Sequence, residues 1–336
     1  MATFFITGGA GFIGSAFVRQ MLEKSDAEVV VYDLLTYAGN LENLADLNTS
    51  RCTFVKGDIC DREAVLAALP DGCEAIFNFA AESHVDRSIH SADEFLRTNI
   101  IGTQVLLDAS RERKVRRFVQ VSTDEVMGSL PDDSGELFTE ASRLQPNSPY
   151  AASKAAAEFI VRAARETHGV DAVVTRCGNN YGPRQFPEKL IPLMIANALN
   201  DIPLPVYGDG RNVRDWIYVD DHCSAIWAAY ERGRDGTAYN IGARNEQYNI
   251  DVVKAILDAL GKPHSLIEYV TDRLGHDRRY AIDPTLAETE LGWTPAVSWT
   301  EGLGRTIEWY LANREWVERI RSGEYRSYYQ KMYGAR

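Results

Sequence analysis

A glycine-rich segment near the start of the chain has the residue types and spacing of a phosphate-binding turn. Thr7 to Gly14 read Thr-Gly-Gly-Ala-Gly-Phe-Ile-Gly, with glycines at Gly8, Gly11 and Gly14. Such glycines between a strand and a helix allow a tight turn and a close approach to a pyrophosphate, which the helix N-terminus attracts. Asp33 ends the next expected strand, where a carboxylate binds adenosine ribose hydroxyls and repels a 2′-phosphate. The segment predicts a site for NAD rather than NADP.

A second motif, Tyr-Ala-Ala-Ser-Lys, begins at Tyr150 and ends at Lys154. Ser148 and Pro149 before it are typical of a helix N-cap and of the first helical residue, and residues four apart on a helix share one face. An ammonium beside a phenol favours the phenolate, so we expect Lys154 to lower the pKa of Tyr150. Tyr150 then takes a proton from an alcohol as hydride leaves the carbon. Without the glycine segment, a chance pair on a helix surface would explain the spacing.

Ser122, Thr123, Asp124 and Glu125 follow an expected strand at residues 117–122. This places them at the carboxyl edge, where doubly wound sheets bind ligands. Thr123 can hydrogen-bond a reacting hydroxyl group. Two adjacent carboxyl groups in a partly dry cleft do not both ionise easily, so we expect one to act as an acid and the other as a base. The alternative is a capped turn on a solvated edge.

The hydrophobic pattern around these motifs predicts an α/β fold. Segments with helical spacing, at 12–24 and 62–69, lie between β-type runs at 3–7, 28–33, 52–57, 74–79, 117–122 and 171–176. This alternation predicts a doubly wound parallel sheet of the Rossmann type with right-handed crossovers. Beyond about residue 176 prolines punctuate the chain, which indicates a smaller α+β lobe. We predict an NAD-binding domain at 1–176, returning at about 215–242, and a substrate-binding lobe at 177–214 and 243–336.

The composition limits the classes of partner. The chain has 336 residues, of which 45% are hydrophobic, and 48 acidic against 36 basic residues give a net charge of -12. This charge repels nucleic acid and anionic membranes, so a phosphate-bearing ligand must meet clustered Arg or Lys. The five cysteines form no C-x-x-C pair and no His cluster has zinc spacing, so we expect no metal and a reducing, cytoplasmic environment. No signal peptide or membrane-spanning run is expected.

Longer motifs carry a resemblance to a known family over nearly the whole chain. The sequence resembles the dTDP-glucose 4,6-dehydratases, a group of extended short-chain dehydrogenases/reductases, at Thr7 to Gly14, Asp33, Leu35 to Asn40, Ala80 to Ser88, Thr123 to Glu125, Tyr150 to Lys154, Asn179 to Pro183, Phe186 to Pro192, Arg214 to Trp216 and Asp272 to Tyr280. These motifs are far more specific than the glycines of the fold.

The resemblance implies that dTDP-glucose is dehydrated to dTDP-4-keto-6-deoxyglucose through an internal redox cycle. It implies that Tyr150 removes the proton of the 4-hydroxyl group while hydride passes from C4 to bound NAD. Glu125 then takes the C5 proton, which the 4-keto group has made acidic, and Asp124 protonates the departing 6-hydroxyl group. The hydride returns to C6, so the cofactor ends as it began.

The resemblance also implies the ligand contacts. Contacts to NAD are expected from the three glycines and from Phe12, Ile13, Asp33, Leu34, Leu35, Thr36, Asp58, Ile59, Ala80, Ala81, Thr98, Tyr150, Lys154 and Asn180. Contacts to the substrate are expected from Ser83, Thr123, Asn179, Lys189, Leu190, Pro205, Tyr207, Arg214, Asn249, Arg273 and His276. Arg214 and Arg273 suit a diphosphate because guanidinium groups match phosphate oxygens; taken alone, each is also consistent with a surface ion pair. Asp58 is equally consistent with a turn residue after Gly57.

Three residues depart from the family pattern: Met127 and Arg184 stand where Tyr is usual, and Leu274 replaces a common Pro. None removes a proposed acid, base or hydride-handling residue. They leave open the details of substrate packing and the preferred sugar nucleotide.

Two alternative functions remain at this point. A nucleotide-sugar 4-epimerase or decarboxylase shares the glycines and the Tyr150 and Lys154 pair, but it needs no acid and base for water loss, which Asp124 and Glu125 provide. A non-catalytic dinucleotide-sensing protein would keep the fold and lose the chemistry. The resemblance further implies a homodimer that pairs helical segments near 98–113 and 151–167; the alternative is that their apolar faces cover only their own sheet.

Overall fold

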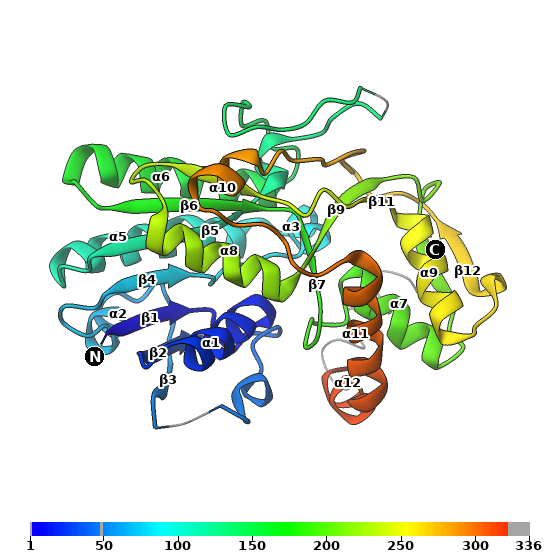
Figure 1. Cartoon of the computed structure of the whole chain (residues 1–336), viewed down its shortest axis with the longest axis horizontal. Helices are drawn as coiled ribbons and strands as arrows, with labels where there is room; N and C mark the ends of the chain where they lie inside the picture. The colour runs from blue at the N-terminus through cyan, green and yellow to red at the C-terminus, as the bar shows by residue number, and fades with distance from the viewer. Residues whose placement is uncertain (1, 48–49, 133, 322–336) are drawn as a thin grey trace.

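The computed structural model describes residues 2–47, 50–132 and 134–321. Its centre is a seven-stranded sheet in the order β10-β6-β5-β4-β1-β2-β3 (Figure 1), and every pairing in it is parallel. The strands are β1 (Thr3–Thr7), β2 (Glu28–Asp33), β3 (Cys52–Lys56), β4 (Ala75–Asn78), β5 (Arg117–Thr123), β6 (Ala172–Cys177) and β10 (Ala238–Ile241). The predicted Rossmann-type fold is therefore confirmed.

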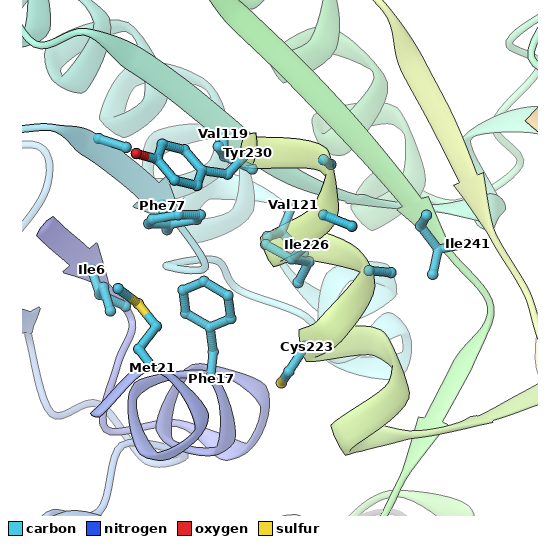
Figure 2. Packing of buried hydrophobic residues seen from close by; sticks show 14 of the residues in the cluster. Ile6, Phe17, Met21, Phe77, Val119, Val121, Cys223, Ile226, Tyr230 and Ile241 are labelled. Atoms are coloured by element: carbon cyan, nitrogen blue, oxygen red, sulfur yellow. The ribbon is translucent and has the colours of Figure 1, made fainter. Parts of the chain in front are cut away.

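Helices cover both faces of this sheet. On one face lie α1 (Phe12–Lys24) and α8 (Val219–Arg232), and on the other α2 (Arg62–Ala68), α5 (Thr103–Glu112) and α6 (Pro149–His168). In the first of these layers, Phe17 of α1 and Ile226 of α8 point toward Phe77 and Val121 of the strands (Figure 2). The ring centroids of Phe17 and Phe77 are 4.6 Å apart. Aromatic packing thus fixes α1, whose N-terminus follows the glycine segment.

A smaller lobe adjoins the carboxyl edge of the sheet and lies at the right of Figure 1. It holds a three-stranded sheet of β7 (Asn179–Tyr181), β9 (Val213–Tyr218) and β11 (Glu246–Tyr248), and a pair of β8 (Leu204–Tyr207) with β12 (Ile267–Val270). Its helices are α7 (Leu190–Leu199), α9 (Asn249–Leu260), α11 (Trp299–Ala312) and α12 (Arg314–Arg321). Residues 322–336 of the predicted lobe lie outside the described residues.

Short helical segments complete the described chain. They are η1 (Leu41–Leu44), α3 (Val85–His90), α4 (Asp93–Leu96), the π-helix η2 (Arg97–Gly102), η3 (Asp124–Met127), η4 (His264–Leu266) and α10 (Thr285–Glu290). Within the described ranges, no helix is long and apolar enough to cross a membrane, and no group of three or more His, Cys, Asp or Glu could hold a metal ion.

The segment at about 215–242, predicted to return to the first domain, divides between the two sheets. Helix α8 and strand β10 join the large sheet, where β10 pairs with β6. Strand β9, which contains Asp215, instead pairs with β7 and β11. The apolar run at β9 is buried in the smaller sheet, and periodicity alone could not distinguish the two destinations. The domain boundaries themselves stay a prediction.

The register of the parallel strands brings the chemical motifs to one edge. Thr7 pairs with Asn78, and Thr123 pairs with Cys177. Because parallel strands share the direction of their carboxyl ends, the glycine segment, the Asp124 and Glu125 turn and the Asn179 and Asn180 segment emerge at the same edge of the sheet.

Candidate active site

The glycine segment forms one wall of a cavity of about 340 Å³ at this edge. Gly8 has φ +65°, and a Cβ atom there would lie 2.6 Å from the backbone nitrogen of Ala80. A Cβ atom on Gly14 would collide with the carbonyl oxygen of Gly8. Gly11 caps α1 without a side-chain hydrogen bond, so the first N–H groups of the helix can turn to a ligand. This cradle fits a pyrophosphate.

Asp33 lies in the same cavity, beside the turn. Its Oδ2 accepts from the backbone N–H of Ala10 at 3.0 Å, and its Oδ1 accepts from the N–H of Leu35 at 2.8 Å. Burial raises the pKa of this carboxyl group, and the two backbone hydrogen bonds oppose the rise. The contacts hold Asp33 where a ribose can meet it. Leu35, predicted to contact NAD, lines neither described cavity; its N–H serves Asp33 instead.

Asp58 both lines the cavity and holds a local turn, which are the two roles that the sequence left open. It lines the cavity, yet its Oδ1 accepts from the N–H of Cys60 at 2.8 Å in a local turn. Its Oδ2 lies 2.8 Å from Nη1 of Arg97. Burial raises its pKa, but the hydrogen bonds from Cys60 and Arg97 lower it more. Asp58 therefore carries a negative charge at this end of the cavity.

The other predicted NAD contacts also line this cavity: Phe12, Ile13, Leu34, Thr36, Ile59, Ala80, Ala81, Thr98, Tyr150, Lys154 and Asn180. The predicted substrate residues Ser83, Thr123, Asn179, Lys189 and Leu190 line it as well. Sequence reasoning missed several lining residues: Tyr32, Ala38, Gly39, Gly57, Phe79, Glu82, Val121, Ser122, Cys177, Gly178, Gln185, Phe186, Glu188 and Trp216. Glu82, Phe186 and Glu188 lie within motifs that carried the resemblance, but nothing in those motifs showed which side chains face a ligand.

Helix α6 begins where the Ser148 and Pro149 signal predicted, and its residues Tyr150 and Lys154 line the larger cavity. The Ser148 hydroxyl accepts from the N–H of Ala151 at 3.1 Å, and Pro149 is the first helical residue. Lys154 donates from Nζ to the carbonyl oxygen of Val121 at 2.7 Å. Burial lowers the pKa of Lys154 to about 8.

The expectation that Lys154 lowers the pKa of Tyr150 is wrong for the protein alone. Burial raises the pKa of Tyr150 well above its ordinary value, and the charges of Glu125 and Asp124 add to the rise. A side-chain hydrogen bond with Thr123 opposes it. The sequence predicted that the Lys154 ammonium lies near the phenol. It could not show that this ammonium donates a hydrogen bond to the main-chain carbonyl oxygen of Val121. The surroundings of Tyr150 in the protein alone therefore favour the phenol over the phenolate.

Asp124 and Glu125 occupy different environments although they are adjacent. Asp124 is 1% exposed, and its Oδ2 has no hydrogen-bond partner among the described residues. Burial and the neighbouring charge of Glu125 raise its pKa well above the ordinary value. Burial also raises the pKa of Glu125, but Arg273, Lys189 and Arg214 oppose that rise. Burial therefore raises the pKa of both carboxyl groups, and more of the nearby cations oppose the rise at Glu125 than at Asp124.

A second cavity of about 150 Å³ continues from the first into the smaller lobe. The two share Glu125, Asn179, Glu188, Lys189, Leu190 and Trp216. The remaining predicted substrate residues line the second cavity: Pro205, Tyr207, Arg214, Asn249, Arg273 and His276. Lining residues without a predicted role are His84, Val85, Asp86, Leu193, Met194, Val206, Val253 and Tyr280. Glu125 thus lies where the larger cavity meets the second one, and Asp124 lines the larger cavity alone.

Of the two arginines of the second cavity, Arg214 is buried and Arg273 is partly buried and paired with the buried Asp86. Arg214 is 4% exposed and donates to the carbonyl oxygens of Val213 and Asp277 at 2.7 and 2.9 Å. Arg273 has Nη1 3.6 Å from Oδ1 of Asp86, and its Nε has no hydrogen-bond partner among the described residues. Two guanidinium groups lining one cavity, one buried and one partly buried, fit an anionic ligand such as a diphosphate.

Glu188 lies where the two cavities meet. Its Oε1 accepts from the Tyr37 hydroxyl group at 2.9 Å, and its Oε2 lies 3.7 Å from Nη2 of Arg87. Burial raises its pKa to about 7. The Tyr37 ring also contacts Phe186 edge to face, at 5.4 Å between centroids. These contacts join the segment after β2 to the loop before α7, across the cofactor cavity.

The three residues that depart from the family pattern line neither of the two described cavities. Met127 is buried in a cluster with Val126 and Tyr280, and Leu274 is 79% exposed. Arg184, at φ +67°, lies 3.5 Å from Asp46 and over the ring of Trp309. Met127 can therefore reach the second cavity only through a neighbour such as Tyr280, and the effect of the three residues on substrate packing stays a prediction.

A Rossmann-type sheet with this pair of cavities defines a dinucleotide-dependent enzyme of the nucleotide-sugar class. The family model for GDP-mannose 4,6 dehydratase matches residues 5–306, and the chain belongs to this family. A dTDP-glucose 4,6-dehydratase of Shigella flexneri is 48% identical and covers 98% of this chain and 99% of its own. One from Xanthomonas campestris is 50% identical over 97% of this chain and 98% of its own. The resemblance to dTDP-glucose 4,6-dehydratases is confirmed.

Solved structures agree with these sequence relatives. DesIV, a dTDP-glucose 4,6-dehydratase from Streptomyces venezuelae with NAD bound, matches with a TM-score of 0.92 and 49% identity, covering 95% of this chain and 99% of its own. A UDP-glucose 4-epimerase from Thermus thermophilus in complex with NAD matches with a TM-score of 0.86 and 30% identity, covering 93% and 99%. Epimerases thus share the architecture at lower identity.

Proposed function

We propose that this protein is an NAD-dependent lyase that dehydrates dTDP-glucose to dTDP-4-keto-6-deoxyglucose. One observation carries the proposal: two buried carboxyl groups with raised pKa, Asp124 and Glu125, line the same cavity as Tyr150 and Lys154. Besides a hydride acceptor, oxidation of an alcohol needs only a base such as the Tyr and Lys pair, whereas loss of water also needs an acid and a second base. The names of the close relatives support dTDP-glucose as the substrate.

When bound in the larger cavity, NAD would supply the acceptor and later the donor of the hydride, and the positive charge of its oxidised ring would favour ionisation of a phenol beside it. The glycine turn, Asp33 and the open end of α1 would hold its diphosphate and ribose. Tyr150 is placed to take the proton of the sugar 4-hydroxyl group, with Thr123 hydrogen-bonded to its side chain. Lys154 stabilises the phenolate once it forms.

The carboxyl pair performs the elimination. Glu125, which Arg273, Lys189 and Arg214 keep more acidic than burial alone would, takes the proton from C5 beside the 4-keto group. Asp124, held protonated by burial and by the charge of Glu125, gives its proton to the departing 6-hydroxyl group. The C5 proton is restored as the hydride returns to C6, so the product differs from the substrate by one water.

An epimerase function is the second candidate because an epimerase has a similar fold. It predicts a product of unchanged mass, and the non-catalytic sensor predicts no product. The test is mass analysis after parallel incubation with dTDP-glucose, UDP-glucose and GDP-mannose. We expect dTDP-glucose to lose one water without net consumption of NAD. An isomer of unchanged mass would identify an epimerase, and unchanged substrate would favour the sensor.

We also infer a cytoplasmic homodimer. Free cysteines such as Cys177 and Cys223 are consistent with a reducing compartment. The dimer inference rests on exposed apolar side chains near the predicted helices, with Leu96, Ile101 and Phe159 being 44%, 55% and 58% exposed. A patch of this kind on neighbouring helices is typical of an interface.

A further inference from the structure

Asp277 lies between the nucleotide half of the cleft and the start of the catalytic helix. Its side chain is 6% exposed. Oδ1 accepts from Nδ2 of Asn147 at 2.6 Å, and Oδ2 accepts from the hydroxyl group of Tyr280 at 2.5 Å. Its main-chain carbonyl oxygen accepts from Nη2 of Arg214 at 2.9 Å. One residue thus joins three parts of the site, although it lines neither described cavity.

Asn147 connects Asp277 to the catalytic helix. It directly precedes Ser148, the N-cap of α6, and stands three residues before Tyr150. The loop that carries Asp277 also contacts the backbone here, since a Cβ atom on Gly275 would lie 3.1 Å from the carbonyl oxygen of Asn147. The position of the helix start is therefore tied to the position of this loop.

The same loop carries the anion-binding side of the second cavity. Arg273 and His276 stand four and one residues before Asp277 and line that cavity. The guanidinium carbon of Arg214 lies 4.2 Å from the ring centroid of Tyr280. Tyr280 in turn is held by Asp277. A diphosphate that engages Arg214 and Arg273 therefore restrains the residues on both sides of Asp277.

We propose that Asp277 is a positioning residue that couples the nucleotide site to the catalytic helix. Binding of the nucleotide end of the substrate fixes the loop at residues 272–279, and Asp277 passes this restraint to Asn147 and so to Tyr150. The Tyr280 hydroxyl group is held at the same time, on the side of Glu125. The inference rests on the proposed function and adds to it a reason why the far end of the substrate affects the reacting end.

If Asp277 only stabilised the fold, its substitution would have a different effect. It would lower the stability of the protein or the affinity for nucleotide, and it would not separate kcat from nucleotide affinity. Coupling predicts the separation, because the diphosphate contacts of Arg214 and Arg273 remain when the link to α6 is cut. A reciprocal exchange at Asn147 and Asp277 keeps a hydrogen-bonded pair with donor and acceptor reversed.

The experiment compares Asn147→Ala, Asp277→Asn and the exchange Asn147→Asp/Asp277→Asn. It measures kcat and KM with dTDP-glucose, and the Kd of dTDP by calorimetry. In both single variants we expect kcat to fall about tenfold, the effect of one hydrogen bond to a charged group, while the Kd changes less than about threefold. The exchange should regain at least about threefold in kcat.

Asn197→Ala is the matched control, because Asn197 is buried and its Nδ2 donates to the carbonyl oxygen of Pro203 at 3.0 Å, outside both described cavities. It should lower Tm and leave kcat within about twofold of the wild type. The inference is overturned if both single variants keep the wild-type kcat, if nucleotide affinity falls in step with kcat, or if the exchange rescues nothing. Turnover of dTDP-glucose by the wild type separately tests the proposed function.

Discussion

Lys154 donates a hydrogen bond from Nζ to the main-chain carbonyl oxygen of Val121 at 2.7 Å. This bond joins the catalytic helix α6 to β5 directly before the Ser122 to Glu125 segment. The ammonium therefore orders the strand end that bears the acid and the base, as well as lying near the phenol. Its role in the site is both electrostatic and structural.

Lys154→Met should change how stability depends on pH. Burial lowers the folded-state pKa of Lys154 to about 8 from 10.5, so between these values the unfolded state binds more protons than the folded state. The lysine's contribution to the free energy of unfolding therefore rises with pH across this range, by about 3 kcal/mol in full. Urea unfolding of both proteins at several pH values measures the difference. A wild-type minus variant difference that is flat between pH 8 and 10.5 would contradict the assigned burial.

Asp124→Asn separates acid chemistry from stability. The folded protein holds Asp124 protonated, whereas the unfolded chain ionises it above its ordinary pKa, so this residue costs stability as the pH rises toward neutrality. Asparagine resembles the protonated acid, so Tm at neutral pH should be equal or higher. We expect kcat to fall about a hundredfold or more because the 6-hydroxyl group loses its proton donor. A lower Tm would contradict the protonated state of Asp124 in the folded protein, and normal turnover would contradict its role as the proton donor.

Glu125→Gln should stop dehydration after the first hydride transfer. The variant keeps the NAD cavity and the Tyr150 and Lys154 pair, so NAD affinity should stay within about twofold, while water loss falls about a hundredfold or more. Product mass and the absorbance of reduced nicotinamide during a single turnover report the two steps. Glu140→Gln is the matched control: Glu140 accepts from the N–H of Asn240 at 2.9 Å and lines neither described cavity. Full turnover by Glu125→Gln would remove Glu125 as the C5 base.

Arg184→Ala should speed the release of NAD. Arg184 lies 3.5 Å from Asp46 and over the ring of Trp309 of α11, and Asn43 in the segment of Asp46 donates to the carbonyl oxygen of Ala10 in the glycine turn. Loss of a half-buried ion pair and a cation–π contact should raise the dissociation rate about threefold to tenfold. Stopped-flow displacement of bound NAD measures the rate. Arg305→Ala, which removes an exposed pair with Glu301 on α11, should leave it unchanged. Equal rates in the wild type and Arg184→Ala would show that the bridge does not retain the cofactor.

Phe159→Glu tests the inferred dimer. Phe159 lies on α6 with 58% of its surface exposed, and a charge there would disrupt an apolar interface while leaving the monomer fold intact. Light scattering should show the wild type as a dimer and the variant as a monomer at the same concentration. Tyr269→Glu, at a residue 59% exposed on β12, should stay dimeric. A monomeric wild type would reject the inference.

Local patterns predicted the framework well because they act over short distances along the chain. The spacing at residues 12–24 gives α1, and the run at 28–33 gives β2. Ser148 and Pro149 specify the start of α6 through a hydrogen bond within three residues. Asp33 was found because the glycine segment and the strand end fix its place relative to α1.

Long-range contacts limited the prediction of the site. The pair of Tyr37 and Glu188 joins residues far apart in sequence, as does the pair of Asn147 and Asp277. Nothing in either local segment selects the partner. The pKa of Tyr150 was predicted in the wrong direction for the same reason, because it depends on burial and on Glu125 rather than on Lys154 alone.

The outer position of β10 beside β6 has a consequence for dissecting the protein. A fragment that stops after β6 would lose α8 as well and leave an uncovered row of backbone donors and acceptors along the sheet. Such a fragment should aggregate instead of folding into an autonomous nucleotide-binding module. Segments of the smaller lobe lie in the chain between β6 and β10 of the large sheet. A single cut in the chain therefore cannot separate the two lobes.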